Sequence, residues 1–260
     1  MLSLLRHARH DGFATRYSGF FLLPATYLPV RYATTDLHGC LHTFRYLVEE
    51  ELHLTPHDEL YLLGDYVNKG PDSRGVLDYL MQLQAAGYQV QCVRGNHDQA
   101  LLDAARHRWR WDWLGPRGRL PTLRSFGVSR LADIPPRYLN WLAALPCEIE
   151  LPDFMLVHAG YDFALPPAAM RQDYSTMLNT KKFIYDPSRL GGRRLLHGHV
   201  PTPTALVRSR AAARPGALGL DTGCVYRHNS ELAHLTALNL DTWQLTMVVN
   251  CEPPYTIGVR

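Results

Sequence analysis

Five short apolar runs along this chain each end in residues of the kind that bind metal ions, and this repeat constrains the fold more than any other feature. One of them, Leu60 to Leu63, ends abruptly in Gly64 and Asp65. Such a run predicts a buried strand with its polar residue at the C-terminal tip. A single aspartate after one strand would more simply be a solvated turn residue. Five recurrences instead indicate one shared site, because ligands collect at the carboxyl ends of strands in layered α/β folds.

The other four runs also deliver metal-type side chains. They are 30–34 before Asp36 and His38, 88–93 before Asn96 and His97, 154–157 before His158, and 195–196 before His197 and His199. Apolar residues at helical spacing over 41–52 follow the run 30–34, and others over 76–83 follow the run 60–63. These two motifs are therefore expected in strand-to-helix loops. Shorter strands are expected over 217–220 and, as a hairpin, over 232–240 and 243–249. The chain is therefore expected to be an α/β protein.

Composition narrows the class of protein. With 260 residues, a formal net charge of +3 and 46% hydrophobic residues, the chain is expected to be globular and not to bind nucleic acid. Its five cysteines lack close paired spacing, which suits reduced thiols in a cytoplasmic protein. The apolar patch 20–23 is too short to span a membrane, and no secretory signal is convincing. We expect a poorly ordered extension over 1–29, a single domain over 30–250 and a C-terminal tail over 251–260.

Residues 99–146 interrupt the strand pattern and are expected to form a helical insertion that caps one edge of the site. Within it, arginines alternate with Trp109, Trp111 and Trp113. These side chains could form a basic, aromatic wall for a phosphorylated or nucleotide substrate. Alternatively, the tryptophans pack on the core while the arginines are solvated, which is the interpretation we favour.

The residue types at the five strand ends indicate the chemistry. Carboxylate, imidazole and amide ligands without thiolates suit Mn²⁺, Fe or Zn²⁺ at a hydrolytic centre better than a structural zinc site. Their number exceeds the needs of one ion. Two divalent metal ions that share one carboxylate are the simplest interpretation, and this arrangement serves in-line phosphoryl displacement.

In these motifs the sequence resembles the calcineurin-like metallophosphoesterases, and more closely the branch with serine/threonine protein phosphatases and symmetrical dinucleoside tetraphosphatases. The similarity covers roughly 30–240. Its motifs are D-x-H-G at 36–39, G-D-x-V-x-x-G at 64–70, G-N-H-D at 95–98, H-A-G at 158–160 and H-G-H at 197–199. The resemblance implies a four-layer αββα sandwich of two mixed sheets with helices outside.

The resemblance also implies a ligand set. Asp36, His38 and Asp65 would hold the first metal, and Asp65, Asn96, His158 and His199 the second. Mn²⁺ is the metal we expect. His197 would then be a buried histidine beside the site or a contact for substrate. Pro201 stands where wider relatives carry a further histidine, which favours the phosphatase branch.

By the same resemblance, a hydroxide between the two metals would attack phosphorus and His97 would protonate the leaving oxygen. Arg94 is expected to clamp the phosphate, and Lys181 to contact it. The chain departs from its close relatives at Asn68 and Lys69, where they have aspartate and arginine. Asparagine cannot stabilise an imidazolium by charge, and lysine lacks a bidentate fork, so we expect slower chemistry, a different optimum or a changed substrate.

Three functions follow from these motifs. The leading expectation is a cytoplasmic phosphomonoesterase of the serine/threonine phosphatase type, acting on a phosphorylated protein. The alternative is symmetrical hydrolysis of dinucleoside tetraphosphates, with the tryptophan wall stacking on adenine. A third interpretation is a degenerate phosphatase that binds phosphorylated partners without hydrolysing them. No membrane partner is expected in any of the three.

Overall fold

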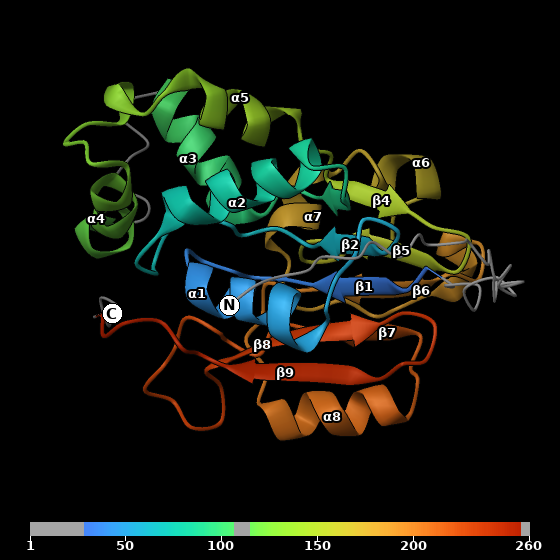
Figure 1. Cartoon of the computed structure of the whole chain (residues 1–260). Helices are drawn as coiled ribbons and strands as arrows, with labels where there is room; N and C mark the ends of the chain where they lie inside the picture. The colour runs from blue at the N-terminus through green and yellow to red at the C-terminus, as the bar shows by residue number, and fades with distance from the viewer. Residues whose placement is uncertain (1–28, 107–114, 256–260) are drawn as a thin grey trace, which may run out of the picture.

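Two mixed sheets lie face to face in the computed structural model, which describes residues 29–106 and 115–255 (Figure 1). The first sheet has the order β3 (Gln89–Cys92), β2 (Glu59–Leu62), β1 (Arg31–Thr34), β8 (His234–Asn239) and β9 (Leu245–Val249). The second has the order β4 (Glu148–Glu150), β5 (Phe154–Val157), β6 (Arg194–His197) and β7 (Ala217–Gly219). Strands β1 to β3 are parallel, as are β5 to β7, while β4, β8 and β9 pair antiparallel with their neighbours. The hairpin of β8 and β9 confirms the strand pattern at the C-terminal end.

Helices cover the outer faces of both sheets. They are α1 (Leu41–Tyr46), α2 (Ser73–Ala85), α3 (Asn96–Arg106), α4 (Gly115–Phe126), α5 (Pro136–Ala144), α6 (Pro167–Met170), α7 (Tyr174–Asn179) and α8 (Thr204–Ala212). Helix α1 continues as a π-helical turn, Leu47–Glu51, and 3₁₀ turns occupy Leu131–Asp133 and Pro187–Leu190. Asp72 caps the N-terminus of α2, because its carboxylate accepts a hydrogen bond from the backbone N–H of Gly75.

Alternation along the strands creates separate cores on the two faces of each sheet. In β2, Leu60 and Leu62 pack under α1 and α2, whereas Tyr61 faces the second sheet. In β5, Leu156 lies between the sheets and Met155 packs on the outer side with Met177 of α7. Because successive side chains of a strand point to opposite faces, the central strands β2 and β5 are buried on both sides. The expected four-layer sandwich of two mixed sheets is confirmed.

The insertion forms α3, α4 and α5, which gather beside α2 (Figure 1). The Trp141 indole donates to Gln84 of α2 at 3.0 Å, and Tyr138 packs edge-on against Phe126. Residues 107–114, with the expected tryptophan wall, and residues 1–28 lie outside the described residues. The two expectations about them stay predictions.

Part of the expected C-terminal tail packs on α1. The Glu252 carboxylate accepts the backbone N–H of Thr43 at 2.8 Å, and its residue is only 4% exposed. The Tyr255 hydroxyl donates to the backbone carbonyl of Val225 at 2.7 Å. Residues 251–255 are therefore part of the folded unit.

One arginine ties the two sheets together. The Arg31 guanidinium, at the start of β1, binds both oxygens of Asp153, which precedes β5 of the other sheet, at 2.9 and 3.0 Å. It also contacts Asp241 in the turn between β8 and β9 at 2.7 Å. Among the described residues, every helix is too short or too polar to cross a lipid bilayer.

Candidate metal centre

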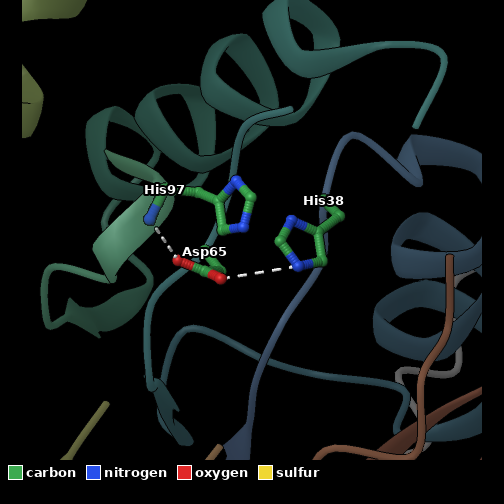
Figure 2. A group of neighbouring side chains, drawn as sticks. All are labelled: His38, Asp65 and His97. Carbon is green, nitrogen blue, oxygen red and sulfur yellow. Dashed lines mark hydrogen bonds and ion pairs between the residues drawn. The ribbon is translucent and has the colours of Figure 1, made fainter. Parts of the chain in front are cut away.

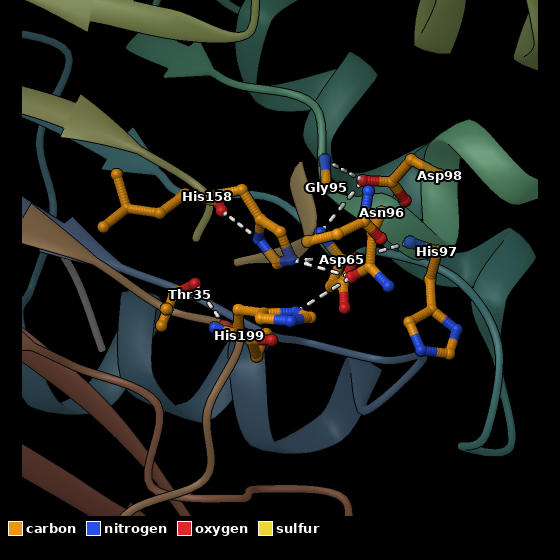
Figure 3. Close-up of polar contacts among 12 residues, drawn as sticks. Thr35, Asp65, Gly95, Asn96, His97, Asp98, His158 and His199 are labelled. Carbon is orange, nitrogen blue, oxygen red and sulfur yellow. Dashed lines mark hydrogen bonds and ion pairs between the residues drawn. The ribbon is translucent and has the colours of Figure 1, made fainter. Parts of the chain in front are cut away.

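The five motif loops converge where β1, β2, β3, β5 and β6 end, as the close-up in Figure 3 shows. Parallel strands bring their carboxyl ends to one edge, so the loops must meet there. Several of the loop residues have positive φ although they are not glycine: Asp36, His38, Asp65, Asn68, Lys69 and His199, with φ from 44° to 72°. Such conformations cost free energy and cluster at functional sites. The surrounding structure thus holds these loops in conformations that bring their side chains together.

Two buried histidines have their tautomers fixed by backbone carbonyls. His38 Nδ1 lies 3.1 Å from the Val67 carbonyl oxygen, and His158 Nδ1 lies 2.8 Å from that of Leu63. A carbonyl only accepts, so each Nδ1 carries the proton and each Nε2 presents a lone pair. This is how metal-binding histidines are commonly oriented.

Asp65 stands between these histidines. Its Oδ2 lies 3.4 Å from His38 Nε2, and its Oδ1 lies 3.5 Å from His158 Nε2. Figure 2 shows the carboxylate beside His38 and His97, and the backbone N–H of His97 donates to Oδ1 at 2.8 Å. Two groups of ligand atoms, each within 4.8 Å, share this residue: one with His38 and His97, the other with His158 and His199. Asp65 therefore occupies the place of a shared carboxylate.

The surroundings of Asn96 fit a cation. As placed, its Oδ1 lies 2.9 Å from His158 Nε2 and 3.2 Å from His199 Nδ1. Turned the other way, its amide nitrogen would instead face both oxygens of Asp65 and the same imidazoles. Acceptor atoms thus converge from three side chains around Asn96, with more lone pairs than one amide can satisfy. A divalent cation bound by oxygen and nitrogen ligands would satisfy them.

Asp36 contacts both sides of the cluster. Its Oδ2 accepts the Thr35 hydroxyl and the backbone N–H of His199, the latter at 3.0 Å. Its Oδ1 lies 3.9 Å from His38 Nε2. All six predicted metal ligands are thus brought into one region, and their roles as ligands stay a prediction.

Asp98 is a supporting residue that the sequence analysis did not single out, although it lies in the G-N-H-D motif. Its carboxylate accepts the backbone N–H groups of Asp65, Tyr66 and Gly95 at 2.9 to 3.0 Å. It therefore holds the loop after β2 against the loop after β3. The signal that could have revealed it is an acidic residue at a position expected to be buried in the first turn of α3.

Glycines let these loops approach more closely than a side chain would allow. A Cβ on Gly95 would lie 2.2 Å from the backbone nitrogen of Asp65, and one on Gly198 would lie 2.1 Å from Asp36 Oδ2. Both distances are far below van der Waals contact. The glycines of the G-N-H-D and H-G-H motifs are therefore required by packing.

Burial and charge set the protonation of the cluster. Burial raises the pKa of Asp65 to about 6, although the positive charge of His158 acts to lower it. Burial and the Lys69 ammonium lower the pKa of His38 and of His97 well below the ordinary value. For His158, burial acts to lower the pKa, but the negative charges of Asp65 and Asp36 outweigh it, and the pKa is raised above its ordinary value. Neutral imidazoles are the form in which histidine binds a metal.

Lys69 and Asn68 lie in the loop after β2, beside the cluster. Lys69 Nζ is 2.7 Å from His38 Nε2 and 5.7 Å from the centre of the Tyr226 ring. Asn68 Nδ2 is 3.3 Å from the backbone oxygen of His97 and 3.5 Å from His97 Nδ1. The structure thus brings both departures from the family pattern to the expected place.

The surroundings of three predicted substrate contacts differ from one another. The Arg94 guanidinium donates to Gln99 and to the backbone carbonyls of Ala143 and Leu145 at the end of α5, each at 2.8 Å. These contacts describe a structural anchor for the insertion, and phosphate binding by Arg94 stays a prediction. His197 packs edge-on against Phe183, and burial lowers its pKa to about 4. Lys181 is exposed.

The residues that follow the H-A-G motif in the sequence line an open cavity of about 550 Å³. Among them are Tyr161, Phe163, Thr180, Lys182 and Phe183. A Cβ on Gly160 would lie 2.5 Å from the Phe183 ring, so this ring packs directly on the loop that carries His158. Aromatic rings suit the faces of planar ligands. The lysine of this cavity is Lys182, one position from the one predicted.

Comparison with known proteins agrees with this geometry. A family model described as Calcineurin-like phosphoesterase matches residues 32–243. A symmetrical bis(5'-nucleosyl)-tetraphosphatase of Pseudomonas putida (strain W619) is 36% identical over 138 residues, which are 52% of this chain and 42% of the relative. One of Glaesserella parasuis serovar 5 (strain SH0165) is 32% identical over 54% of this chain and 50% of the relative. The chain spans about half the length of these relatives.

Solved structures share the fold. A crystal structure named as that of a diadenosine tetraphosphatase has a TM-score of 0.59 at 24% identity, over 87% of this chain and 97% of that one. A serine/threonine phosphatase from Saccharomyces cerevisiae with similarity to human phosphatase PP5 has a TM-score of 0.62 at 12% identity, over 87% of this chain and 81% of that one. At these identities the likeness concerns the fold alone.

Proposed function

Because the chain belongs to the calcineurin-like phosphoesterase family, we propose that it is a two-metal hydrolase that cleaves dinucleoside tetraphosphates at the middle of the phosphate chain. The observation that carries the proposal is the Asp65 carboxylate shared by two groups of ligand atoms. The names of the curated relatives support this substrate over the phosphoprotein of our leading sequence expectation. The fold alone links the chain to a serine/threonine phosphatase.

The residues of the site divide the work of holding the metals. The first ion would lie among Asp36, His38 and Asp65, and the second among Asp65 and the group Asn96, His158 and His199. When bound, such ions activate water for attack and neutralise phosphoryl oxygens. Mn²⁺ is our choice, with Fe and Zn²⁺ compatible with the same donor atoms.

The remaining residues of the site bind and orient the substrate. The Lys69 ammonium, beside His38, supplies positive charge for a phosphoryl oxygen. His97 faces the same region and donates a hydrogen bond to the leaving oxygen. The aromatic cavity after the H-A-G motif offers a surface on which one nucleobase can stack.

A substrate comparison tests the proposal. The protein is stripped with a chelator, reloaded with Mn²⁺ and given diadenosine tetraphosphate or a phosphothreonine peptide. We expect the nucleotide to be cleaved into two molecules of ADP, with a higher kcat/KM than the peptide. A preference for the peptide would support the phosphatase interpretation. Metal-dependent binding without turnover of either substrate would support the degenerate phosphatase.

A further inference from the structure

The loop after β2 contains two consecutive residues in the left-handed backbone conformation. They are Asn68 and Lys69, with φ of 70° and 69°. Asparagine adopts this conformation readily, whereas it is unfavourable for lysine. Contacts from elsewhere in the fold must therefore hold the turn in place. These contacts come from helix α4 of the insertion and from the first turn of α2.

Thr122 of α4 binds the first residue of the turn at two points. The backbone N–H of Asn68 donates to Thr122 Oγ1 at 3.1 Å, and the Thr122 hydroxyl donates to Asn68 Oδ1 at 2.8 Å. The same N–H also donates to Ser73 Oγ, at the start of α2, at 3.0 Å. Thr122 and Ser73 are 0% exposed and Asn68 is 1% exposed. Loss of one of these hydrogen bonds would therefore leave a buried polar group unsatisfied.

Backbone contacts hold the rest of the turn. The backbone N–H of Lys69 donates to the carbonyl oxygen of Gly118 in α4 at 3.3 Å. At the end of the turn, the backbone N–H of Gly70 donates to the carbonyl oxygen of His38 at 2.9 Å, and a Cβ on Gly70 would lie 2.0 Å from that oxygen. The turn 68–70 is thus held between α4 and the loop after β1.

The conformation of this turn determines where the Lys69 side chain starts. From the turn the ammonium reaches the candidate metal centre, where Nζ lies 2.7 Å from His38 Nε2. The φ and ψ angles of a residue set the direction in which its side chain leaves the backbone. A turn that relaxed to negative φ would therefore redirect the Lys69 side chain and move its charge away from the site.

We propose that helix α4 positions the substrate-binding charge of this site: Thr122 holds the turn of Asn68 and Lys69 in its left-handed conformation, and the turn directs the Lys69 ammonium to the phosphoryl group of the substrate. Thr122 is then a positioning residue that acts through Lys69 without touching the substrate. The inference rests on the role of Lys69 as a substrate contact in the proposed function. It makes the insertion a working part of the site.

A double-mutant cycle tests whether Thr122 acts through Lys69. Wild type, T122V, K69M and the double variant, all loaded with Mn²⁺, are compared in kcat/KM for 4-nitrophenyl phosphate. We expect T122V to lower kcat/KM roughly tenfold, the equivalent of about 1.4 kcal/mol, in the wild-type background and less than about twofold in the K69M background. T122S, which keeps the hydroxyl, should stay within about twofold of the wild type. T246V, the same change at a half-buried threonine of β9, is the matched control and should resemble the wild type.

The cycle distinguishes a positioning residue from one that only packs α4 on the domain. Equal losses from T122V in the two backgrounds would show a purely structural role and overturn the inference. S73A removes the other acceptor of the Asn68 N–H, so its effect should also depend on Lys69. If T122V does not fold, the same cycle with S73A decides between the two roles.

A spectroscopic measurement tests the backbone of the turn without substrate. In ¹⁵N-edited NOE spectra, a strong intraresidue signal between the amide proton and Hα marks a residue with positive φ, because that conformation brings the two protons close together. We expect strong signals for Asn68 and Lys69 in the wild type and in T122S, and weaker ones in T122V. Weak signals in the wild type, or unchanged strong signals in a folded T122V, would refute the role of Thr122.

The outcomes separate this inference from the choice of substrate. Cleavage of 4-nitrophenyl phosphate with the expected coupling, but without cleavage of diadenosine tetraphosphate, would overturn the dinucleotide substrate and leave the role of Thr122 standing. Cleavage of both compounds without coupling between Thr122 and Lys69 would do the reverse. If neither compound is cleaved, the proposed function fails, and the same cycle on the Kd of inorganic phosphate, measured by isothermal titration, tests the inference.

Discussion

Asp65 connects the two halves of the candidate metal centre, because one carboxylate lies beside imidazoles that come from different sheets. His38 follows β1 of the first sheet and His158 follows β5 of the second, and both lie within 3.5 Å of Asp65 oxygens. The backbone N–H of His97 fixes the same carboxylate at 2.8 Å. A change at this residue therefore affects both groups of ligands.

We predict that Asp65→Asn abolishes Mn²⁺-dependent hydrolysis of 4-nitrophenyl phosphate. The amide removes the negative charge that both ions would share, so the loss should exceed the roughly 10- to 100-fold that follows from losing a residue that only orients a ligand. Activity is measured after chelation and metal add-back. Asp133→Asn, an exposed aspartate paired with Arg130, is the control and should behave like the wild type. Retained activity in Asp65→Asn would rule out the shared carboxylate.

At the scale of elements, the short loops after β3 and β6 depend on glycine where they approach other backbone or side chains. Gly95 lies against Asp65, and Gly198 lies against Asp36 and Thr35. This tight packing fixes the positions of the proposed metal ligands in the two loops.

Gly95→Ala is expected to weaken metal binding and destabilise the fold, because its Cβ would lie 2.2 Å from Asp65 Oδ1 and from its backbone nitrogen. Overpacking of this kind costs roughly 1–3 kcal/mol. Isothermal titration with Mn²⁺ and urea unfolding measure the two effects. Gly87→Ala is the matched change: its φ is +87° but its Cβ would meet nothing within 4 Å, so only the backbone strain should appear. Equal metal affinity in both variants would contradict the prediction.

Arg31 offers a test of how the two sheets are joined. Replacing it with Met removes paired contacts to Asp153 and a contact to Asp241, and we expect the free energy of unfolding to fall by about 1 kcal/mol, less at high salt. The estimate is modest because these side chains are 24% to 41% exposed. Arg45→Met, which breaks an exposed pair with Glu49 within one helical segment, is the control. A smaller loss for Arg31 than for Arg45 would argue against a link between the sheets.

Elements were predictable where local pattern decides them. The strands lie within about two residues of the predicted runs, and the signal is continuous and apolar in β5, which is buried on both faces. The end of the first helix was not predictable, since its last turn is π-helical at Leu47–Glu51 and no local residue marks the change. The partners of Asp98 and Arg94 depend on contacts across the fold, which spacing along the chain does not reveal.

At the scale of the whole molecule, the ligands come from strands of both sheets, so metal binding should stabilise the sandwich as a unit. Removing the metals with a chelator is expected to lower Tm, and Mn²⁺ should restore it with increasing concentration. A ligand at 100 times its Kd stabilises by about 2.7 kcal/mol. Differential scanning calorimetry measures the shift, with Asp65→Asn as the variant that should lose it. A Tm independent of Mn²⁺ in the wild type would mean that the cluster binds no metal under these conditions.

The layered architecture and the region of the site were accessible from the sequence through the five motifs, whereas the contact between the insertion and the site was not. Thr122 lies 54 positions from Asn68, and the hydrogen bond between them depends on how α4 packs beside α2. The substrate was also ranked differently by the sequence alone, because the shared motifs do not separate phosphoesters from phosphoanhydrides. The names of the curated relatives are what favour the dinucleoside tetraphosphate of our proposal.

Lys69 occupies the position beside His38 where the first proposed metal ion would bind. Its ammonium, 2.7 Å from His38 Nε2, is a cation tethered to the same loop as Asp65. If His38 binds a divalent ion as proposed, that ion would have to displace the ammonium, whose effective concentration is high because a short stretch of chain holds it in place. The displaced side chain would then be available to contact an anionic substrate. One lysine can therefore serve as the counter-ion of the metal-free site and as a substrate contact in the loaded one.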